Sequence, residues 1–412
     1  MKQIGLIGIN HESINTAIFL ASSDWQVSVL ASQRQIDEIL NTYQFDRQLL
    51  LLWHLYVSDN KILLKDELKS LTHYWLFFDE NNDNNDIALE LTPSSQVLLS
   101  GAKSLNFFAN FANQLATNWV YYVPFNFLKD GNNFNAFFNI ELLLIGEKVK
   151  DSFAKSEILL SLIKNSDKQY FVDIKTIEFA RASIMGMLAT RLSFINEMAR
   201  LADSENINIH QVQTIMGMDK RIGKDYLKAG WGFGGKTLPN ELTHLLNKFN
   251  ANQVDTALLK SVIDVNNDQK ELIFRKFWQY FNGFIDNKTV VIWGAGYRVG
   301  VGLTIGSAIH QLLALCWPYQ IKTIVYAVNT TNELKGLYGD NPLFELTHSP
   351  YDNLNNAHAL FILNWAENEK INLDELNQVA LPIFDGKNLF SADEIAGYKG
   401  EYFGIGVNCF NG

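Results

Sequence analysis

Short apolar runs alternate with amphipathic stretches in the first third of the chain. Residues 3–9 predict a buried strand, which is followed by a turn, an apolar helix over 13–21 and a second strand over 26–30. This order of strand, helix and strand is typical of a parallel sheet. Further strands are predicted over residues 75–78, 97–99 and 119–123.

The middle of the chain has a helical period instead. From residue 174 to about 202 there is no proline, and apolar side chains recur every three or four residues: Ile177, Ala180, Ile184, Leu188, Leu192 and Ile195. A helix of this length usually packs against another helix or a second subunit. A second helical stretch is predicted over residues 242–266.

Near residue 287 the strand-and-helix pattern returns. A strand over 289–293 leads into the glycine turn GAGYRVG and a helix over 304–315, and further strands are predicted over 324–326 and 359–363. The fold class predicted is therefore α/β, with two Rossmann-like domains joined by a helical central domain that contains the long helix. The boundaries predicted are 1–174, 175–284 and 285–412, and a chain of 412 residues is long enough for several cores.

Composition excludes several other classes. Apolar residues make up 47% of the chain and charged residues 19%, as in globular proteins, and the net charge of -10 disfavours nonspecific binding to nucleic acid. No run approaches the ~20 apolar residues that cross a bilayer. The most apolar stretch, residues 49–57, is interrupted by His54 and predicts a buried helix. The acidic segment 79–86, DENNDNND, predicts a solvated loop.

The start of the chain and its cysteines favour a cytoplasmic protein. Met1, Lys2 and Gln3 lead directly into GLIGI, so no signal peptide is predicted. The cysteines Cys316 and Cys409 form neither a disulfide framework nor a recognisable metal or redox motif. No metal site is predicted.

The first turn, GINHES, occupies the place of a dinucleotide-binding fingerprint. In GxGxxG the glycines let the backbone approach a pyrophosphate at a helix N-terminus. Here Gly8 keeps its place, whereas Asn10 and Ser13 replace the second and third glycines. The acidic residue that holds a ribose hydroxyl of NAD, expected at the end of the second strand, is absent. Ser32 and Arg34, which lie there instead, suit the 2′-phosphate of NADP. Two alternatives stay open: this domain binds NAD or NADP, or it is kept for its packing.

Three ordered motifs in the middle of the chain carry a family resemblance. Residues 188–197 lie in the helix ARASIMGMLATRLSFINEMARLAD, residues 216–223 read MGMDKRIG, and residues 230–241 read GWGFGGKTLPNE. Together they resemble KxxxNAxLAxKISFINE, GxDxRIG and GxGFGGSCFPKD of the UDP-glucose/GDP-mannose dehydrogenase family. Upstream PFNFLKDG is similar to that family's PEFLREG, and downstream GAGYR and DGKN are similar to its GLAFK and DxRN.

The resemblance implies a chemistry from which this chain departs. The family oxidises a sugar-nucleotide alcohol to a carboxylate through a cysteine thiohemiacetal, and Thr237 stands where the family has that cysteine. Arg181 replaces a helix lysine, Met185 an asparagine and Glu241 an aspartate. Arginine does not exchange protons near neutral pH, and an unactivated hydroxyl is a poor nucleophile. The four-electron oxidation is therefore not expected.

The positions implied for the nucleotide sugar are better preserved. Arg221 matches an arginine that crosses the family's dimer to reach the sugar, and Arg298 and Lys387 keep positive charge where the family has lysine and arginine. The other positions implied are Asn126, Phe127, Leu128, Asn196, Phe233, Gly234 and Gly235. The structural alternatives are a surface or interface salt bridge for Arg221, a solvated loop lysine for Lys236 and a tight turn for the glycines.

Three hypotheses for function follow. In the first, the chain is a pseudoenzyme that binds a nucleotide sugar or regulates polysaccharide metabolism. In the second, it is an active NAD(P)-dependent oxidoreductase, with Glu241 as a base acting through water and Arg181 stabilising an oxyanion. In the third, it is a structural partner of another enzyme. The resemblance also implies a homodimer through the central segment and a substrate cleft between the domains.

Overall fold

The computed structural model describes all residues except 1, 70, 81–90, 129–132, 366–369 and 410–412. It forms two compact units, Met1–Ile184 with Thr243–Gln253, and Met185–Leu242 with Val254–Gly412. The division falls inside the long central helix, and the boundaries at 174/175 and 284/285 stay a prediction. Most of the acidic segment 79–86, and Asp130 of PFNFLKDG, lie outside the described residues.

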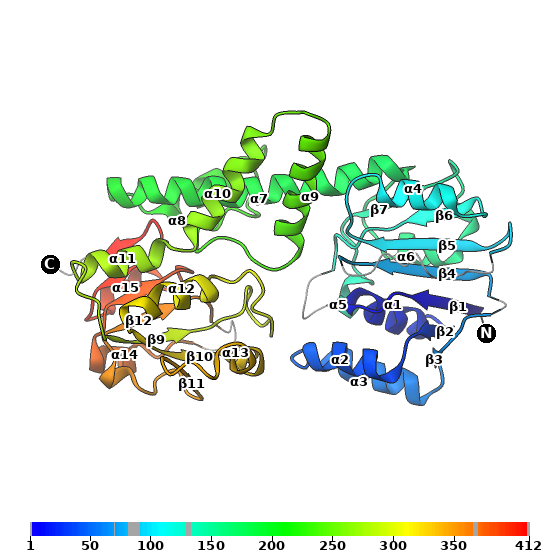
Figure 1. Cartoon of the computed structure of the whole chain (residues 1–412). Coiled ribbons are helices and arrows are strands. Elements are labelled where there is room, and N and C mark those ends of the chain that lie inside the picture. The colour runs from blue at the N-terminus through cyan, green and yellow to red at the C-terminus, as the bar shows by residue number, and fades with distance from the viewer. Residues whose placement is uncertain (1, 70, 81–90, 129–132, 366–369, 410–412) are drawn as a thin grey trace. The chain divides into compact units, whose positions relative to one another are not determined.

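The first unit is built on an eight-stranded sheet in the order β3-β2-β1-β4-β5-β6-β7-β8 (Figure 1). Neighbouring strands are parallel, apart from β6 and β7, which are antiparallel. The first six positions follow the order of dinucleotide-binding folds, whose ligand crevice opens where the order reverses, here between β1 and β4. The strands are β1 Lys2–Ile7, β2 Trp25–Leu30, β3 Ile62–Lys65, β4 His73–Phe78, β5 Gln96–Gly101, β6 Trp119–Tyr122, β7 Leu143–Glu147 and β8 Gln169–Asp173.

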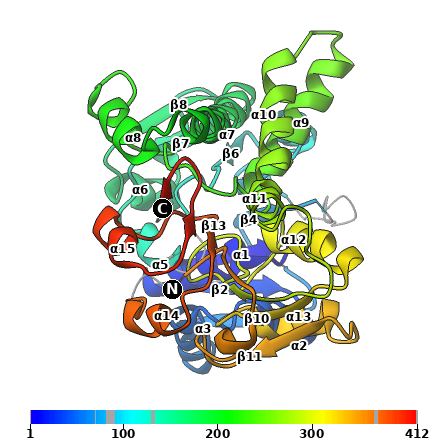
Figure 2. The ribbon, with the colours of Figure 1, turned by 90° about the vertical axis from the view of Figure 1, so that its left-hand side faces the viewer.

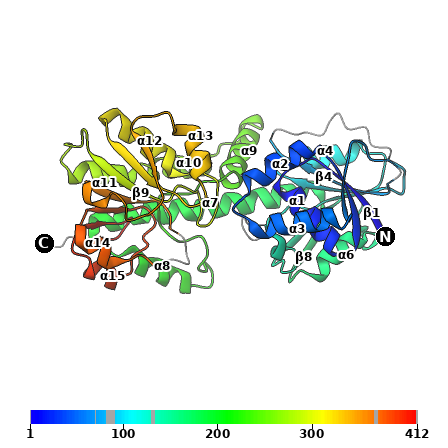
Figure 3. The same ribbon diagram turned by 90° about the horizontal axis from the view of Figure 1, so that it is seen from below.

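Helices cover both faces of this sheet. Side chains of α1, α2, α3 and α6 share one apolar core, and α4 and the start of α7 share a second. Figure 3 shows α1 and α3 side by side. The helices are α1 His11–Ser22, α2 Gln33–Thr42, α3 Arg47–Ser58, α4 Phe107–Gln114, α5 Asn133–Ala136, α6 Glu157–Lys164 and α7 Ile174–Glu205, with a short 3-10 turn over Phe153–Lys155.

The second unit contains a seven-stranded sheet in the order β11-β10-β9-β12-β13-β14-β15, parallel except between β14 and β15. Figure 3 shows α12 and α13 on one side of this sheet and α14 and α15 on the other. Its strands are β9 Thr289–Trp293, β10 Lys322–Tyr326, β11 Phe344–Thr347, β12 Ala359–Ile362, β13 Ile383–Asp385, β14 Tyr402–Phe403 and β15 Asn408–Cys409.

The central helices of this unit flank the second half of α7. Helix α8 runs beside that half (Figures 1 and 2), where Ile209 joins Ala199 and Ala202 in the core. The helices are α8 Ile209–Met218, α9 Thr237–Ala251, of which residues 243–251 belong to the first unit, α10 Ala257–Gln269, α11 Leu272–Tyr280, α12 Ala308–Cys316, α13 Thr331–Tyr338, α14 Leu373–Val379 and α15 Ala392–Gly397.

The α/β class, the parallel sheets and the long helix are confirmed, whereas three helix predictions were wrong in detail. The stretch 242–266 is two helices, because Gln253 has a left-handed φ of 55° between α9 and α10. Helix α12 begins at Ala308 rather than residue 304, because Gly306 has φ 65° and Ser307 caps the helix. Among the described residues, no helix is long and apolar enough to span a membrane.

The third wrong detail concerns α3, which was predicted to be buried. The helix lies on the surface of the sheet, so one face alone is covered. Leu49 and Trp53, four residues apart, are buried, whereas Leu51 is 72% exposed. An apolar run thus predicted the helix correctly but not its depth.

A buried carboxyl group fixes α4 against α7 in the first unit. Glu178 accepts hydrogen bonds from the backbone N–H groups of Phe108 (2.9 Å) and Ala109 (3.2 Å). It therefore caps α4, where Asn106 makes no side-chain cap. Burial raises the pKa of Glu178 to about 7, although these amide bonds oppose the shift.

We expect this shift to make stability depend on pH. The pKa of the Glu178 carboxyl is about 7 in the folded protein, above the ordinary value of 4.5. The protonated carboxyl therefore stabilises the folded state below pH 4.5, and this contribution is lost as the pH rises through 7. Relative to Glu178→Gln, the wild type should lose up to about 3 kcal/mol of unfolding free energy between about pH 5 and about pH 8. Urea denaturation at both pH values measures the difference; a difference that does not change with pH would contradict the assignment.

Candidate functional site

The loop over residues 230–236 is bonded through its backbone to three parts of the second unit. The Gly230 N–H donates to Asn196 Oδ1 on α7 (2.9 Å), and the Gly230 carbonyl accepts from Gln269 Nε2 on α10 (2.8 Å). The Trp231 N–H donates to the carbonyl of Gly386, next to β13 (2.7 Å). The loop is therefore a junction between two central helices and the sheet.

Trp231 and Phe233 anchor this junction. The Trp231 indole N–H donates to the carbonyl of Leu363 at 2.8 Å, and the side chain is 1% exposed. Asn266 on α10 forms a two-way pair with Phe233: its Oδ1 accepts the Phe233 N–H (2.7 Å), and its Nδ2 donates to the Phe233 carbonyl (3.1 Å). The backbone N–H and carbonyl groups of Phe233 are thus both hydrogen-bonded within the protein.

Two glycines of the loop lie against a second glycine-containing turn. A Cβ on Gly234 would come within 2.5 Å of the Gly306 carbonyl oxygen, so a larger residue does not fit without movement of the backbone. Gly235 has φ 77° and lies against the ring of Tyr297, and its N–H donates to the carbonyl of Ile305 at 2.9 Å. The glycine frame is explained by this close approach of two backbones.

The residues predicted to bind substrate divide into separate groups. Asn196 and Phe233 take part in loop packing, as above. Lys387 lies with its Nζ 5.3 Å from the centre of the Trp231 ring, and burial, with Lys228 nearby, lowers its pKa although Asp385 opposes this. Lys387 thus lies at the loop, beside Trp231.

Arg221 lies in a different place. Its side chain is 89% exposed and pairs with Asp219 at 2.6 Å in the segment between α8 and the glycine loop. Arg191 on α7, which the sequence did not single out, holds that segment: its guanidinium donates to the carbonyls of Ile222 (2.6 Å) and Asp225 (2.6 Å), and also to that of Gly223. Arg221 is therefore presented outward by a fixed turn.

The positions where the related family has its catalytic residues, and where this chain has other residue types, differ in their exposure to solvent. Thr237 is exposed and is the first residue of α9. Glu241, one turn later, is 2% exposed, and Arg181 on α7 is 8% exposed. Lys236 is exposed. Thr237 and Glu241 belong to the second unit and Arg181 to the first, so each is described within its own unit.

The first turn of the N-terminal unit is closed by its own side chains. Gly8 has φ 84° and makes the turn after β1. Asn10 Oδ1 accepts the Ser13 N–H at 2.9 Å, and Ser13 Oγ accepts the Asn10 N–H at 3.0 Å. Next to them the His11 ring stacks on Tyr43, with centroids 3.8 Å apart. The N–H groups of Asn10 and Ser13 are thus bonded internally and are not offered to a pyrophosphate, unlike the glycines of the fingerprint.

Ser32 and Arg34 are likewise engaged at the start of α2. Ser32 caps the helix in a reciprocal pair with Gln35, whose Oε1 accepts the Ser32 N–H at 2.9 Å. Arg34 pairs with Glu38 at 3.0 Å, with its side chain 88% exposed. Both residues thus have a structural role in the helix.

The upstream residues Asn126, Phe127 and Leu128 lie against the core of the first unit. Phe127 meets the rings of Phe125 and Phe137 at centroid distances of 5.5 and 5.6 Å. Asn126 Nδ2 donates to the Leu142 carbonyl at 3.4 Å, and Leu128 packs against the same core. Within the described residues, these side chains contribute to packing.

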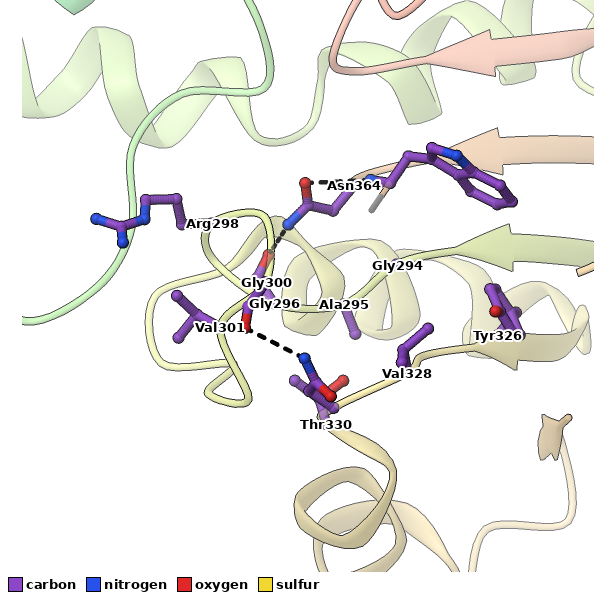
Figure 4. A pocket seen from close by; sticks show the side chains of 12 residues that line it. Gly294, Ala295, Gly296, Arg298, Gly300, Val301, Tyr326, Val328, Thr330 and Asn364 are labelled. Atoms are coloured by element: carbon purple, nitrogen blue, oxygen red, sulfur yellow. Dashed lines mark hydrogen bonds between the residues drawn. The ribbon is translucent and has the colours of Figure 1, made fainter. Parts of the chain in front are cut away.

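A pocket opens at the carboxyl ends of β9, β10 and β12 (Figure 4). Its volume is ≈ 80 Å³, and the turn Gly294–Gly296 forms one wall. Asn364 Nδ2 donates to the Gly296 carbonyl at 3.3 Å, and Asn329 Nδ2 donates to the Gly300 carbonyl at 3.2 Å. Arg298 lines the pocket, but its guanidinium points away from Asn364 and Thr330 in Figure 4.

Two Rossmann-like sheets, a long central helix and a glycine loop together define the fold of nucleotide-sugar dehydrogenases. A UDP-glucose dehydrogenase from Pyrobaculum islandicum superposes with a TM-score of 0.80 over 98% of both chains at 17% identity. An NDP-N-acetyl-D-galactosaminuronic acid dehydrogenase from Methanosarcina mazei superposes with 0.77, over 99% of this chain and 96% of that one, at 16% identity. These likenesses show the fold.

Sequence comparison places part of the chain in a family. Residues 175–268 match the model of the central domain of the UDP-glucose/GDP-mannose dehydrogenase family. The chain is 25% identical to a UDP-glucose 6-dehydrogenase of Pseudomonas aeruginosa over 68% of its length, and 29% identical to one of Bacillus subtilis over 58%. These alignments span 63% and 54% of the two relatives, less than two thirds of each. Residues 175–268 thus carry the central domain of the UDP-glucose/GDP-mannose dehydrogenase family, and the chain as a whole shares the fold of these enzymes.

The packing role of the loop glycines gives a direct prediction. Gly234→Ala should lower the unfolding free energy by about 1–3 kcal/mol, because the added methyl meets the Gly306 backbone. Gly336→Ala in α13 is the matched control: nothing lies within 4 Å of a Cβ there, so a gain of up to about 1 kcal/mol is expected. Denaturant unfolding of both variants measures these changes; equal stability of the two would refute the close-approach explanation.

Proposed function

We propose that the chain is a nucleotide-sugar-binding member of its family that does not carry out the four-electron oxidation. The observation that carries this proposal is the closed turn at Asn10 and Ser13. Hydride transfer needs a bound nicotinamide, and two amides at the turn where its pyrophosphate would lie are bonded to side chains instead. The protein would then act by binding or regulation in polysaccharide metabolism, as a pseudoenzyme.

The substituted catalytic positions support the same proposal. A cysteine thiolate adds to an aldehyde, whereas the hydroxyl of Thr237 needs an activating base. Arginine does not exchange protons near neutral pH, so Arg181 supplies charge but no proton transfer. Met185, one turn further along α7, offers no hydrogen bond donor. The covalent intermediate of the second oxidation step therefore has no group to form on.

Retained features at the loop support binding of a nucleotide sugar. The frame of Gly232, Gly234 and Gly235 is intact, and Lys387 lies beside it at the Trp231 ring. A partly desolvated ammonium next to an aromatic face suits an anionic or heterocyclic ligand. The aligned relatives of known name are UDP-glucose 6-dehydrogenases, which favours a nucleoside diphosphate sugar as the ligand class.

A homodimer is part of this proposal. Met187, Phe194 and Leu201 recur every seven residues on α7 and are 62%, 46% and 56% exposed. An apolar stripe of this kind along a long helix is suited to packing against a second copy. Arg221, held outward by the turn that Arg191 fixes, would then be available to the partner's site.

The alternative is an active oxidoreductase with altered chemistry. It rests on one observation, that the two charged groups at degenerate catalytic positions are buried: Arg181 is 8% exposed and Glu241 2%. Burial of a charge is costly unless it has a partner, so both groups have a defined environment. A single alcohol oxidation would use Glu241 as the base through water, and it would require NAD or NADP.

Calorimetry with NAD, NADP, UDP-glucose and GDP-mannose separates these proposals. We expect one nucleotide sugar to bind and neither dinucleotide to do so; at about 100 times Kd the bound sugar should add about 2.7 kcal/mol of stability. The same sample should sediment as a dimer. Binding of NAD or NADP would favour the oxidoreductase, and binding of no nucleotide sugar would leave the structural-partner hypothesis.

A further inference from the structure

Both backbone groups of Gly230, the first residue of the glycine loop, are held by side-chain amides. Asn196 on α7 accepts the Gly230 N–H at 2.9 Å, and Gln269 on α10 donates to the Gly230 carbonyl at 2.8 Å. Gln269 is 0% exposed, so the groups packed around its amide decide which way the amide points. The start of the loop therefore depends on what holds Gln269.

Arg200, one turn after Asn196 on α7, fixes which end of the Gln269 amide faces the loop. Its Nε donates to Gln269 Oε1 at 2.8 Å, and its Nη2 donates to the Val265 carbonyl at 3.1 Å. In a reversed amide, Oε1 would face the Gly230 carbonyl oxygen and Nε2 would face the guanidinium. Two acceptors and two donors would then meet, so Arg200 selects one orientation.

An acidic residue in turn holds Arg200. Asp268, next to Gln269 on α10, pairs with Arg200 Nη1 at 2.6 Å and with Nη1 of Arg275 on α11 at 2.5 Å. Hydrogen bonds from Arg275, with the charge of Arg200 nearby, lower the pKa of Asp268 although burial opposes this. Within the described parts of the chain, Arg200 bonds both Asp268 and Gln269, whereas Arg275 bonds Asp268 but not Gln269.

The position of Gly230 decides where Trp231 lies. Gly230 is buried, so loss of the Gln269 bond would leave its carbonyl oxygen without a donor in the interior. The loop would have to shift to satisfy this oxygen. Trp231, the next residue, would shift as well, and with it the ring that lies 5.3 Å from Lys387 Nζ.

We propose that Arg200 is a positioning residue for the nucleotide-sugar site at the glycine loop, an inference that rests on the proposed function. Arg200 acts through the Gln269 amide and the Gly230 carbonyl, which together fix Trp231. The affinity of the loop for its ligand thus depends on a side chain of α7 that bonds no residue of the loop itself. Arg275, which shares Asp268 but does not bond Gln269, contributes to stability alone.

Arg200→Met and Arg275→Met are a matched pair of variants, because each removes one of the two arginines from Asp268 and leaves the other. Calorimetry of the full chain with UDP-glucose and with GDP-mannose compares their affinities. Arg200→Met should bind the tighter of these two ligands at least about tenfold more weakly than the wild type. Arg275→Met should change that affinity by less than about twofold. Since both variants lose one ion pair of Asp268, the difference reports on Gln269.

Fluorine NMR follows Trp231 without any ligand. Fluorotryptophan labels the nine tryptophans of the chain, and Trp231→Phe identifies the resonance of Trp231. Arg200→Met should shift or broaden this resonance, whereas Arg275→Met should leave it in place. Gln269→Met should also move it, and addition of Arg200→Met to Gln269→Met should move it no further.

Three results would overturn the positioning role: an unmoved Trp231 resonance in Arg200→Met, a further shift in the double variant, or wild-type affinity of Arg200→Met for the ligand. Equal losses of affinity in Arg200→Met and Arg275→Met would overturn it as well. Failure of both nucleotide sugars to bind the wild type would instead contradict the proposed function, while the Trp231 resonance would still show whether Arg200 positions the loop.

Discussion

The contact between the backbones of Gly234 and Gly306 is the constraint on which the second unit depends. No side chain fits between these two turns, since a Cβ on Gly234 would lie 2.5 Å from the Gly306 carbonyl oxygen. Around this contact, Asn196 of α7 and Asn266 and Gln269 of α10 bond the loop backbone, and Trp231 extends it to the sheet. The loop therefore keeps its glycines for as long as the unit keeps its fold, whatever chemistry takes place beside it.

Positions that carry chemistry are not subject to this constraint. Thr237 is exposed at the head of α9, so exchange of a cysteine for threonine there disturbs no packing. At the N-terminal turn, Asn10 and Ser13 replace glycines and gain a reciprocal cap on α1. Substitution thus costs little at these sites, and the helix cap contributes stability of about 1 kcal/mol. A frame held by packing and a set of exposed or self-capped positions free to change are consistent with our proposal of a retained fold with altered chemistry.

Periodicity and motif spacing predicted much of the fold but less of the site. The strands and α7 follow from local patterns, whereas the break at Gln253 and the late start of α12 depend on left-handed backbone conformations that no apolar pattern reports. Asn196 was assigned to substrate, and it bonds the Gly230 N–H. Asn266 and Gln269 escaped notice, although two amide side chains three residues apart on one helix are a signal of a shared partner. Their role requires a segment distant in sequence, which pattern alone does not supply.

If the missing cysteine is one of several linked departures, restoring the sulfur alone should not restore oxidation, and this is the most direct test. Thr237→Cys should be assayed for NADH formation with NAD and UDP-glucose, next to the wild type. We expect no NADH above the wild-type level, because the Asn10–Ser13 cap, Arg181 and Met185 remain. Sustained NADH formation by the Thr237→Cys protein would contradict it, since a single missing thiol would then explain the whole difference.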